Sequence, residues 1–406
     1  MNITETTKPA WNAVFSIALG VAGLIMAEFL PTGVLTPMAN DLGITEGVTG
    51  QSVTATSIAA VFTSVTLPYF SRKLNRRTVM LGLSFLLICS NMLVAFSPNF
   101  TILLGGRFIL GIALGGFWSM SAAIAMRLVP QQHGPRALAI IYGGCSFASV
   151  LAAPLGSFLG DIIGWRNVFL LSGMLSVVAF LWQAFTLPSL KPIGETKIST
   201  LLEVLKIQNF SVGMLAVALV FCGHFAVFTY LRPFLENTTG VGVDALSMIL
   251  LAFGIANFIG TSFAGFMIKE SLHKTLFLLP FCLFLVAVGL LQFGESIFLT
   301  PVLICLWGAI CGPVPVAWSA WVVRKVPEYA ETGGGIYVAA VQFAAAVGAM
   351  VGGLTFDVTG SKGVLVLGCL SWLLSAVVVV WRIKPIIKVI HATCGADNTQ
   401  LSRETV

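Results

Sequence analysis

Residues 101–126 read TILLGGRFILGIALGGFWSMSAAIAM, an apolar stretch whose one charged side chain is Arg107. A helix needs about 20 mostly apolar residues to cross a bilayer, so this stretch is long enough to span a membrane. Burying a charge at the bilayer centre costs at least about 2.5–3.5 kcal/mol, which makes Arg107 a candidate functional residue. Gly111 and Gly115 are four residues apart and form a flat stripe on which a second helix can pack closely.

The composition of the whole chain is that of a membrane protein. Of its 406 residues 57% are hydrophobic and 9% are charged, whereas soluble domains carry about 25% charged residues. This excludes a disordered chain, a nucleic-acid binder and a secreted disulfide scaffold. The eight cysteines form no CxxC pair and all but Cys394 lie in apolar runs, so we expect neither a metal centre nor a redox cofactor.

Apolar stretches of spanning length recur along the chain, and their number predicts the architecture. We expect twelve spans, at residues 12–35, 49–70, 78–96, 100–126, 137–159, 167–187, 210–232, 244–267, 275–293, 298–322, 333–356 and 363–381. The predicted fold class is therefore an all-α membrane protein of two six-helix bundles. The expected parts are 1–187, the N-terminal bundle; 188–209, a cytoplasmic linker; 210–381, the C-terminal bundle; and 382–406, a cytoplasmic tail.

The basic residues predict the orientation. With the N-terminus inside, 18 of the 22 Lys and Arg residues fall in inner segments and three in outer segments. The remaining one, Arg107, lies within a predicted span. Inner loops of membrane proteins are rich in Lys and Arg, so both termini are predicted to be cytoplasmic. The net charge of +6 then faces anionic lipid of the inner leaflet and requires no acidic partner. The expected location is the bacterial cytoplasmic membrane.

The two halves of the chain repeat weakly. A shift of 197 residues places Gly111, Gly115, Arg127 and Pro130 on Gly308, Gly312, Arg324 and Pro327. A six-span unit duplicated in the same orientation is typical of secondary transporters whose halves are related by a pseudo-two-fold axis along the membrane normal. We therefore expect a transporter and not an enzyme, because no nucleophile–base pair or metal-ligand cluster occurs in the spans.

Three ionisable residues lie inside predicted spans at a similar depth, about 10–12 Å below the outer surface at about 1.5 Å per residue. They are Glu28, Arg107 and His224. A shared depth predicts one cavity, and a carboxylate that gains and loses an arginine partner changes its affinity for a proton with conformation. The alternatives are a structural ion pair between Glu28 and Arg107, and a packed core histidine at position 224.

Polar and aromatic side chains in the spans are candidates for lining a substrate path. Aromatic faces can stack on a planar ring, and amides can form hydrogen bonds with its edge. The predicted substrate-contacting residues are Gln51, Trp118, Ser119, Tyr142, Asn257, Trp307, Trp318 and Gln342. Each of them could instead serve in helix packing.

Three motifs resemble those of a known family. Arg107-Phe-Ile-Leu-Gly111-Ile-Ala-Leu-Gly115 is similar to the span-four motif of the major facilitator superfamily, and Glu28-Phe-Leu-Pro31 is typical of one of its subgroups. Ala153-Pro154-Leu-Gly156, followed by Gly160, resembles the span-five motif of its drug:proton antiporters. The variant is that of exporters of nucleosides and sugars. The resemblance covers the whole chain and implies that Arg107 takes part in proton transfer.

One loop departs from the superfamily's pattern. Between spans two and three the family usually has a glycine, an acidic residue, a second glycine and then basic residues, and the acidic residue helps to latch the cytoplasmic gate. Here Pro68, Arg72 and Asn75 occupy those places, and only the basic pair Arg76 and Arg77 remains. A latch of the family's usual kind is therefore in doubt, and we interpret the basic pair by the positive-inside rule.

The resemblance and the buried charges together predict a proton-coupled antiporter that exports a small polar solute. Purine ribonucleosides such as inosine and guanosine are the first expectation. The alternatives are export of an arabinose-like sugar or of several drugs by the same mechanism, and uptake of a nutrient by symport. The expected partners are the solute, protons and the lipid bilayer, with no nucleic acid, and the chain is expected to act as a monomer.

Overall fold

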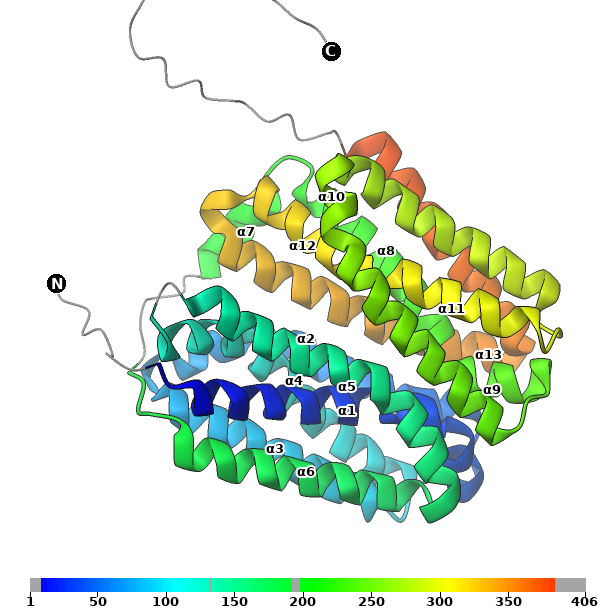
Figure 1. Ribbon diagram of the computed structural model, residues 1–406, viewed down its shortest axis with the longest axis horizontal. Coiled ribbons are helices and arrows are strands. Elements are labelled where there is room, and N and C mark those ends of the chain that lie inside the picture. Colours follow the sequence, from blue (N-terminus) through cyan, green and yellow to red (C-terminus); the bar gives the residue numbers. More distant parts are fainter. Residues whose placement is uncertain (1–8, 131–132, 192–197, 384–406) are drawn as a thin grey trace, which may run out of the picture.

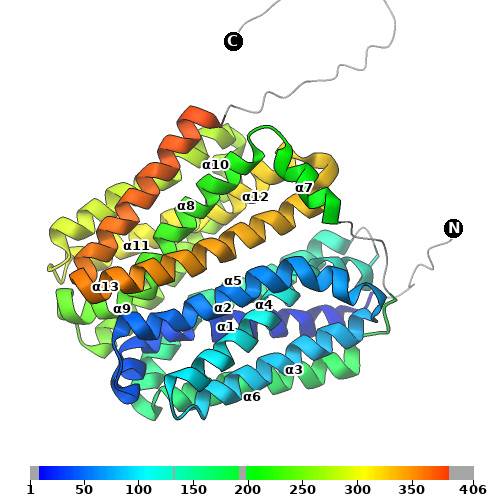
Figure 2. The ribbon, with the colours of Figure 1, turned by 180° about the vertical axis from the view of Figure 1, so that it is seen from behind.

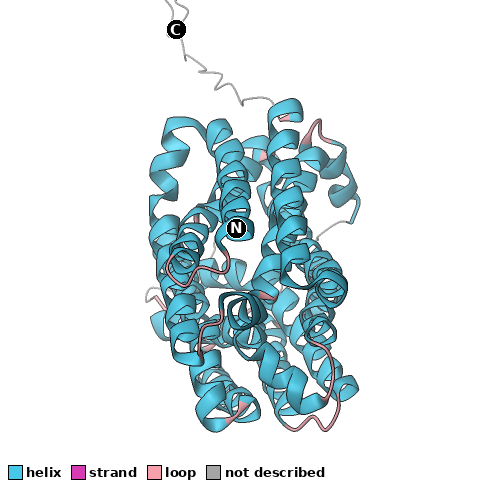
Figure 3. Ribbon diagram, turned by 90° about the vertical axis from the view of Figure 1, so that its right-hand side faces the viewer, coloured by secondary structure: helices cyan, strands magenta, loops and turns pink. Residues whose placement is uncertain are grey.

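The computed structural model describes residues 9–130, 133–191 and 198–383, and within these ranges it contains helices and connecting loops but no strand (Figure 3). This confirms an all-α architecture. The helices of the first half are α1 (Trp11–Leu42), α2 (Glu46–Phe70), α3 (Arg76–Ala95), α4 (Phe100–Leu128), α5 (Gly134–Ile163) and α6 (Trp165–Thr186). Those of the second half are α7 (Ile198–Lys206), α8 (Phe210–Thr229), α9 (Leu231–Phe234), α10 (Val243–Phe293), α11 (Leu299–Cys311), α12 (Pro313–Lys325) and α13 (Ala330–Arg382). Short turns η1 (Ser71–Lys73), η3 (Leu235–Thr239) and η4 (Pro327–Tyr329) complete the order.

The helices form two groups that lie side by side. Helices α1–α6 make up one group and α8–α13 the other, as opposite views show (Figures 1 and 2). The buried apolar cores follow the same division, since one core cluster draws almost all its members from the second half and two others lie wholly in the first. The groups meet mainly where α2 packs on α13 and α5 packs on α10. We call the groups the N-bundle and the C-bundle.

Local signals in the sequence set the helix ends. The Thr45 hydroxyl and the Asn99 side chain accept hydrogen bonds from the Val48 and Ile102 N–H groups, which caps the starts of α2 and α4. Gly43 follows α1 with φ 64°, a conformation that a residue without Cβ adopts at no steric cost. The α1–α2 and α3–α4 turns that carry these caps lie at the same end of the N-bundle, where Arg166 binds both Asp41 and Ser97.

Nine helical stretches in the described part of the chain are long and apolar enough to cross a membrane. Two of them, α10 and α13, have 51 residues or more and bend at one non-helical residue each, Ser271 and Gly360. The bends fall between predicted spans eight and nine and between spans eleven and twelve. Helix α2 is not among the nine, so the number of twelve spans stays a prediction. Most of the predicted tail, 384–406, lies outside the described residues.

Close packing of small residues repeats between the bundles with the spacing of the sequence repeat. A Cβ atom on Gly111 of α4 would overlap the backbone carbonyl of Thr56 on α2. A Cβ atom on Gly308 of α11 would overlap the backbone carbonyl of Phe253 on α10. The two glycines are 197 positions apart in the chain, and so are the two residues that they contact, Thr56 and Phe253. The glycine stripes therefore serve the same purpose in each half, which is to bring two backbones into contact.

Candidate functional site

Arg107 is fully buried on α4 and binds backbone oxygens of two neighbouring helices. Its guanidinium donates to the carbonyls of Ala27 at 2.6 Å and Glu28 at 3.2 Å on α1, and to the carbonyl of Ser52 at 3.3 Å on α2. Arg107 therefore joins three helices of the N-bundle at one point. Among the described residues it makes no ion pair with the Glu28 carboxylate in this conformation.

The Glu28 side chain is 7% exposed and lies where the bundles meet. It interacts electrostatically with Arg107 and with Cys145 of α5, and its carboxylate interacts with the Gln342 side chain of α13. Gln342 belongs to the C-bundle, so the surroundings of this carboxylate change whenever the bundles move relative to each other. A buried acid whose surroundings change with conformation can bind a proton more tightly in one conformation than in another.

His224 lies on α8 within a cluster of aromatic rings. Its ring stacks on Phe228 with centroids 5.3 Å apart and meets Trp307 edge-on at 5.6 Å, while its Nδ1 is 3.3 Å from the sulfur of Cys311. Phe29, next to Glu28, packs against Phe228 at 5.7 Å. Aromatic contacts through Phe29 and Phe228 thus connect α1 with the cluster around His224.

The other predicted path residues fall into three environments. Trp118 on α4 and Tyr142 on α5 stack with centroids 6.1 Å apart, and Tyr142 is 50% exposed. The nearby Ser119 hydroxyl donates to the Gly116 carbonyl. Asn257 is partly exposed on α10. In contrast, Trp307 and Trp318 are each 1% exposed and belong to the C-bundle core, so neither faces an open path in this conformation.

The span-five motif packs against a bend in α1. Val34, three residues after Pro31, has non-helical backbone angles inside α1. A Cβ atom on Gly160 would press on the Val34 side chain, and one on Gly156 would meet Leu30. Pro154 lies inside α5, one turn before this contact. The motif therefore lets α5 follow the bent half of α1 closely.

Hydrogen bonds between the bundles gather at one end of the molecule. The Asp357 carboxylate of α13 accepts from the Thr45 hydroxyl at 2.9 Å and from the Gly47 N–H at 3.2 Å, at the start of α2. One and two turns further along α2, Gln51 and Thr54 donate to carbonyls of α13. Gln51, predicted to contact substrate, therefore takes part in bundle closure here.

Arg232 forms the second half of this closure. It is 3% exposed, and from α9 its guanidinium donates to the Gly33 carbonyl of α1 and to the Ser157 hydroxyl of α5. Glu236 holds it in place, accepting from Arg232 at 2.8 Å and from the Thr36 hydroxyl at 2.7 Å. We call the end that carries these contacts and the Asp357 contacts the sealed end.

Within the described residues, no hydrogen bond joins the bundles at the opposite end, where α1 begins and α13 ends. Most of the basic residues that the structure describes lie there, and we call it the basic end. Its loop residues bind their own bundle: the Asn75 side chain caps α3, and Arg76 donates to Ser71. The unusual loop therefore provides no latch across the bundles in this conformation.

Three carboxylates lie close together at the sealed end. Burial raises the pKa of the Glu46 carboxyl above its ordinary value of 4.5, the neighbouring Thr36 hydroxyl lowers it, and the charges of Glu236 and Asp357 raise it further. The group is therefore more readily protonated when the sealed end is formed than in water. The sequence pattern does not reveal this cluster, and it counts Arg232 only as one of the three basic residues of the outer segments at the end of span 210–232. Hydropathy reports burial in lipid and not contact across two bundles.

Comparisons with known proteins agree with this architecture. The model of the Major Facilitator Superfamily matches residues 17–348 and 213–393 of the chain. The chain is 44% identical to the purine ribonucleoside efflux pump NepI of Salmonella enteritidis PT4 (strain P125109) over 93% of its own length and 95% of that protein. The pump of the same name from Escherichia coli O1:K1 / APEC is also 44% identical, over 93% of this chain and 96% of the relative. The resemblance seen in the motifs is confirmed, and the chain belongs to the Major Facilitator Superfamily, as a multi-pass membrane transporter and not an enzyme.

Proposed function

We propose that this protein exports purine ribonucleosides such as inosine and guanosine across the inner membrane in exchange for protons. The assignment of the substrate rests on sequence identity. The chain is 44% identical, over nearly the full length of both chains, to proteins named purine ribonucleoside efflux pump. The coupling to protons is supported by Glu28, a buried acid that lies between the two bundles.

The basic end faces the cytoplasm in this proposal, because Lys and Arg gather on the inner side of membrane proteins. Both described chain ends, at residues 9 and 383, then lie on the cytoplasmic side. The sealed end, with Asp357 and Arg232, faces outward. The conformation is accordingly the one that receives solute from the cytoplasm.

The solute is bound between the bundles on the cytoplasmic side of Glu28. Tyr142 is half exposed and stacked on Trp118, and together they offer an aromatic face to a purine ring. Gln342, which also interacts with Glu28, offers an amide to the edge of the ring. Solute and proton thus compete for the surroundings of one carboxylate, which is the basis of exchange.

Glu28 is the proton carrier of this cycle. When the sealed end opens, Gln342 moves with the C-bundle and the carboxylate loses that partner, while Arg107 stays on the backbone carbonyls of its own bundle. The affinity of Glu28 for a proton therefore differs between the two conformations. The ring of His224 packs against Phe228 and Trp307 in the C-bundle, and its share in this proton stays a prediction.

The test is proton release from energised inside-out vesicles that contain the protein. Inosine, guanosine, arabinose and ethidium are added in turn while an acid-sensing dye reports the internal pH. A response to inosine and guanosine, absent from vesicles without the protein, supports the proposal. A response to arabinose alone would identify the substrate as a sugar, and a response to ethidium alone would identify it as a drug. Uptake of labelled inosine into intact cells, driven by the inward proton gradient, would show symport and overturn export.

A further inference from the structure

The groove between α3 and α6 has a chemistry that the transport cycle does not use. It holds about 570 Å³ and is lined by Asn75, Arg77, Thr78, Leu81, Gly82, Phe85, Phe180 and Ser189. Helices α3 and α6 pack on each other and lie on the side of the N-bundle remote from the C-bundle (Figures 1 and 2). The groove is therefore on the outer wall of the protein, away from the bundle interface.

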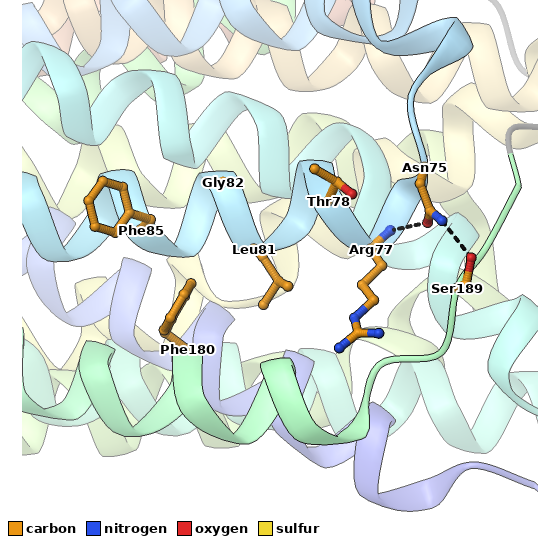
Figure 4. A pocket seen from close by; sticks show the side chains of 8 residues that line it. All are labelled: Asn75, Arg77, Thr78, Leu81, Gly82, Phe85, Phe180 and Ser189. Atoms are coloured by element: carbon orange, nitrogen blue, oxygen red, sulfur yellow. Dashed lines mark hydrogen bonds between the residues drawn. The ribbon is translucent and has the colours of Figure 1, made fainter.

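Polar and apolar side chains occupy opposite ends of this groove. Asn75, Arg77 and Ser189 lie together at the basic end, and Phe85 and Phe180 lie at the other end (Figure 4). Eight residues of helix separate Arg77 from Phe85, which is about 12 Å along the helix axis. The lining of the groove thus changes along the membrane normal, from polar side chains at the membrane interface to aromatic side chains in the hydrocarbon region.

The rim of the groove is a fixed structure. The Asn75 side chain accepts from the Arg77 N–H at 3.0 Å and donates to the Ser189 hydroxyl at 2.6 Å, which ties the start of α3 to the segment after α6 (Figure 4). The Arg77 guanidinium donates to the Ala184 carbonyl at 2.6 Å. A guanidinium has five N–H donors, so this one acceptor leaves capacity for a ligand.

Basic residues gather near the rim, and in the part of the chain that the structure describes none of them forms an ion pair. Arg72, Lys73 and Arg76 lie within five residues of Arg77, whereas residues 71–100 and 165–191, which form both walls, contain no Asp or Glu. Basic pockets between spanning helices on the cytoplasmic side attract anionic lipid head groups. The floor suits an acyl chain: Phe85 is 55% exposed, and a Cβ atom on Gly82 would meet no atom within 4 Å.

We propose that the α3/α6 groove binds one anionic phospholipid of the cytoplasmic leaflet. The phosphate lies at the rim beside Arg77, and one acyl chain lies along Leu81 and Gly82 onto the rings of Phe85 and Phe180. This site is independent of the solute path, and its existence does not depend on the substrate.

The experiment uses the purified full-length protein in a neutral detergent with phosphatidylglycerol as the ligand, and native mass spectrometry counts the lipids retained per protein. Gly82→Leu fills the floor without changing a charge. Its matched control is Gly105→Leu, at another exposed helical glycine with open space around it, on α4. The proposal expects Gly82→Leu to lose one retained lipid and Gly105→Leu to keep it. Equal retention by wild type and Gly82→Leu overturns it.

Two further measurements test whether the bound phosphate belongs to a lipid and whether binding requires the positive charge of Arg77. Arg77→Gln should weaken phosphatidylglycerol binding about fivefold, whereas Lys274→Gln, which removes an exposed charge at the same end of the C-bundle, should not. Glycerol 1-phosphate should not displace the lipid, and phosphatidylcholine should not replace it. Displacement by glycerol 1-phosphate, or equal binding of phosphatidylcholine, contradicts an anionic lipid site.

Discussion

The Arg107 guanidinium donates a hydrogen bond to the backbone carbonyl of Glu28 at 3.2 Å and not to the carboxylate of the same residue. Together with the bonds to Ala27 and Ser52, this contact makes Arg107 a fixed cation that holds α1, α2 and α4 together. The carboxylate is left free to interact with Gln342 of the other bundle. The structural role of Arg107 and the proton exchange that we propose for Glu28 therefore belong to two neighbouring side chains.

Replacing Glu28 with Gln should abolish solute-driven proton release in vesicles while the protein still folds and inserts. The amide keeps the volume of the side chain and carries no exchangeable acidic proton. Exchange of labelled inosine across the membrane without a proton gradient should persist, since it needs only the solute site. The matched control is Glu270→Gln, at an exposed acid of α10. Normal proton release by Glu28→Gln would show that another group carries the proton.

Replacing Arg107 with Lys should lower both stability and transport. A lysine ammonium is a compact charge and cannot reproduce the planar fork that spans carbonyls on two helices. Each buried carbonyl left without a donor costs about 1–3 kcal/mol. The midpoint of thermal unfolding in detergent should fall accordingly, whereas Arg136→Lys, at an exposed arginine of α5, should leave it unchanged. An unchanged midpoint would mean that charge alone is required at position 107.

Replacing Asp357 with Asn should loosen the sealed end. The carboxylate accepts from the Thr45 hydroxyl and the Gly47 N–H, and hydrogen bonds to charged groups contribute about 1.5–3 kcal/mol, more than neutral ones. Hydrogen–deuterium exchange of the amides at residues 46–50 should therefore become faster. Glu295→Gln provides the control, because its exposed pair with Lys362 lies within the C-bundle. Equal protection in both variants would exclude Asp357 from the closure.

The sealed end should be more stable at acidic pH. Because the pKa of Glu46 is raised when this end is formed, the closed conformation binds the proton more tightly than an open one in which Glu46 is hydrated. Its advantage is complete below the ordinary pKa of 4.5 and is lost as the pH rises through the raised value. Spin labels at the exposed positions Ile162 and Met248 should report a longer distance at pH 8 than at pH 5. Glu46→Gln should remove most of this difference, and a pH response of unchanged size in that variant would refute the assignment.

Adding one methyl group to the repeat glycines should be costly. Ala at Gly111 or Gly308 places a Cβ atom against a backbone carbonyl of the neighbouring helix, and overpacking of this kind costs about 1–3 kcal/mol. The thermal midpoint should fall in both variants and stay unchanged in Gly105→Ala, where the added atom meets open space. Equal midpoints in the three variants would show that α2 and α10 can move away without penalty.

Much of the architecture is readable from the sequence because lipid imposes a local rule. A spanning stretch must be mostly apolar, so hydropathy locates most of the helices without knowledge of their partners. A buried charge is costly at any rotation of its helix, so Glu28 and Arg107 stand out from the apolar residues around them. The glycine repeat at a shift of 197 is visible for a similar reason, since small residues are needed wherever two backbones touch.

The tertiary structure alone decided which residues meet across the bundles. The chain positions of Arg232 and Gly33 are 199 residues apart, and those of Asp357 and Thr45 are 312 apart, so no local pattern connects either pair. The burial of Trp307 and Trp318 likewise depends on tertiary packing. It follows from which faces of α11 and α12 are turned toward the C-bundle core. Apolar residues satisfy lipid and protein equally well, so the sequence by itself determined which segments are in the membrane, and only the packing of whole helices determined which of their faces touch.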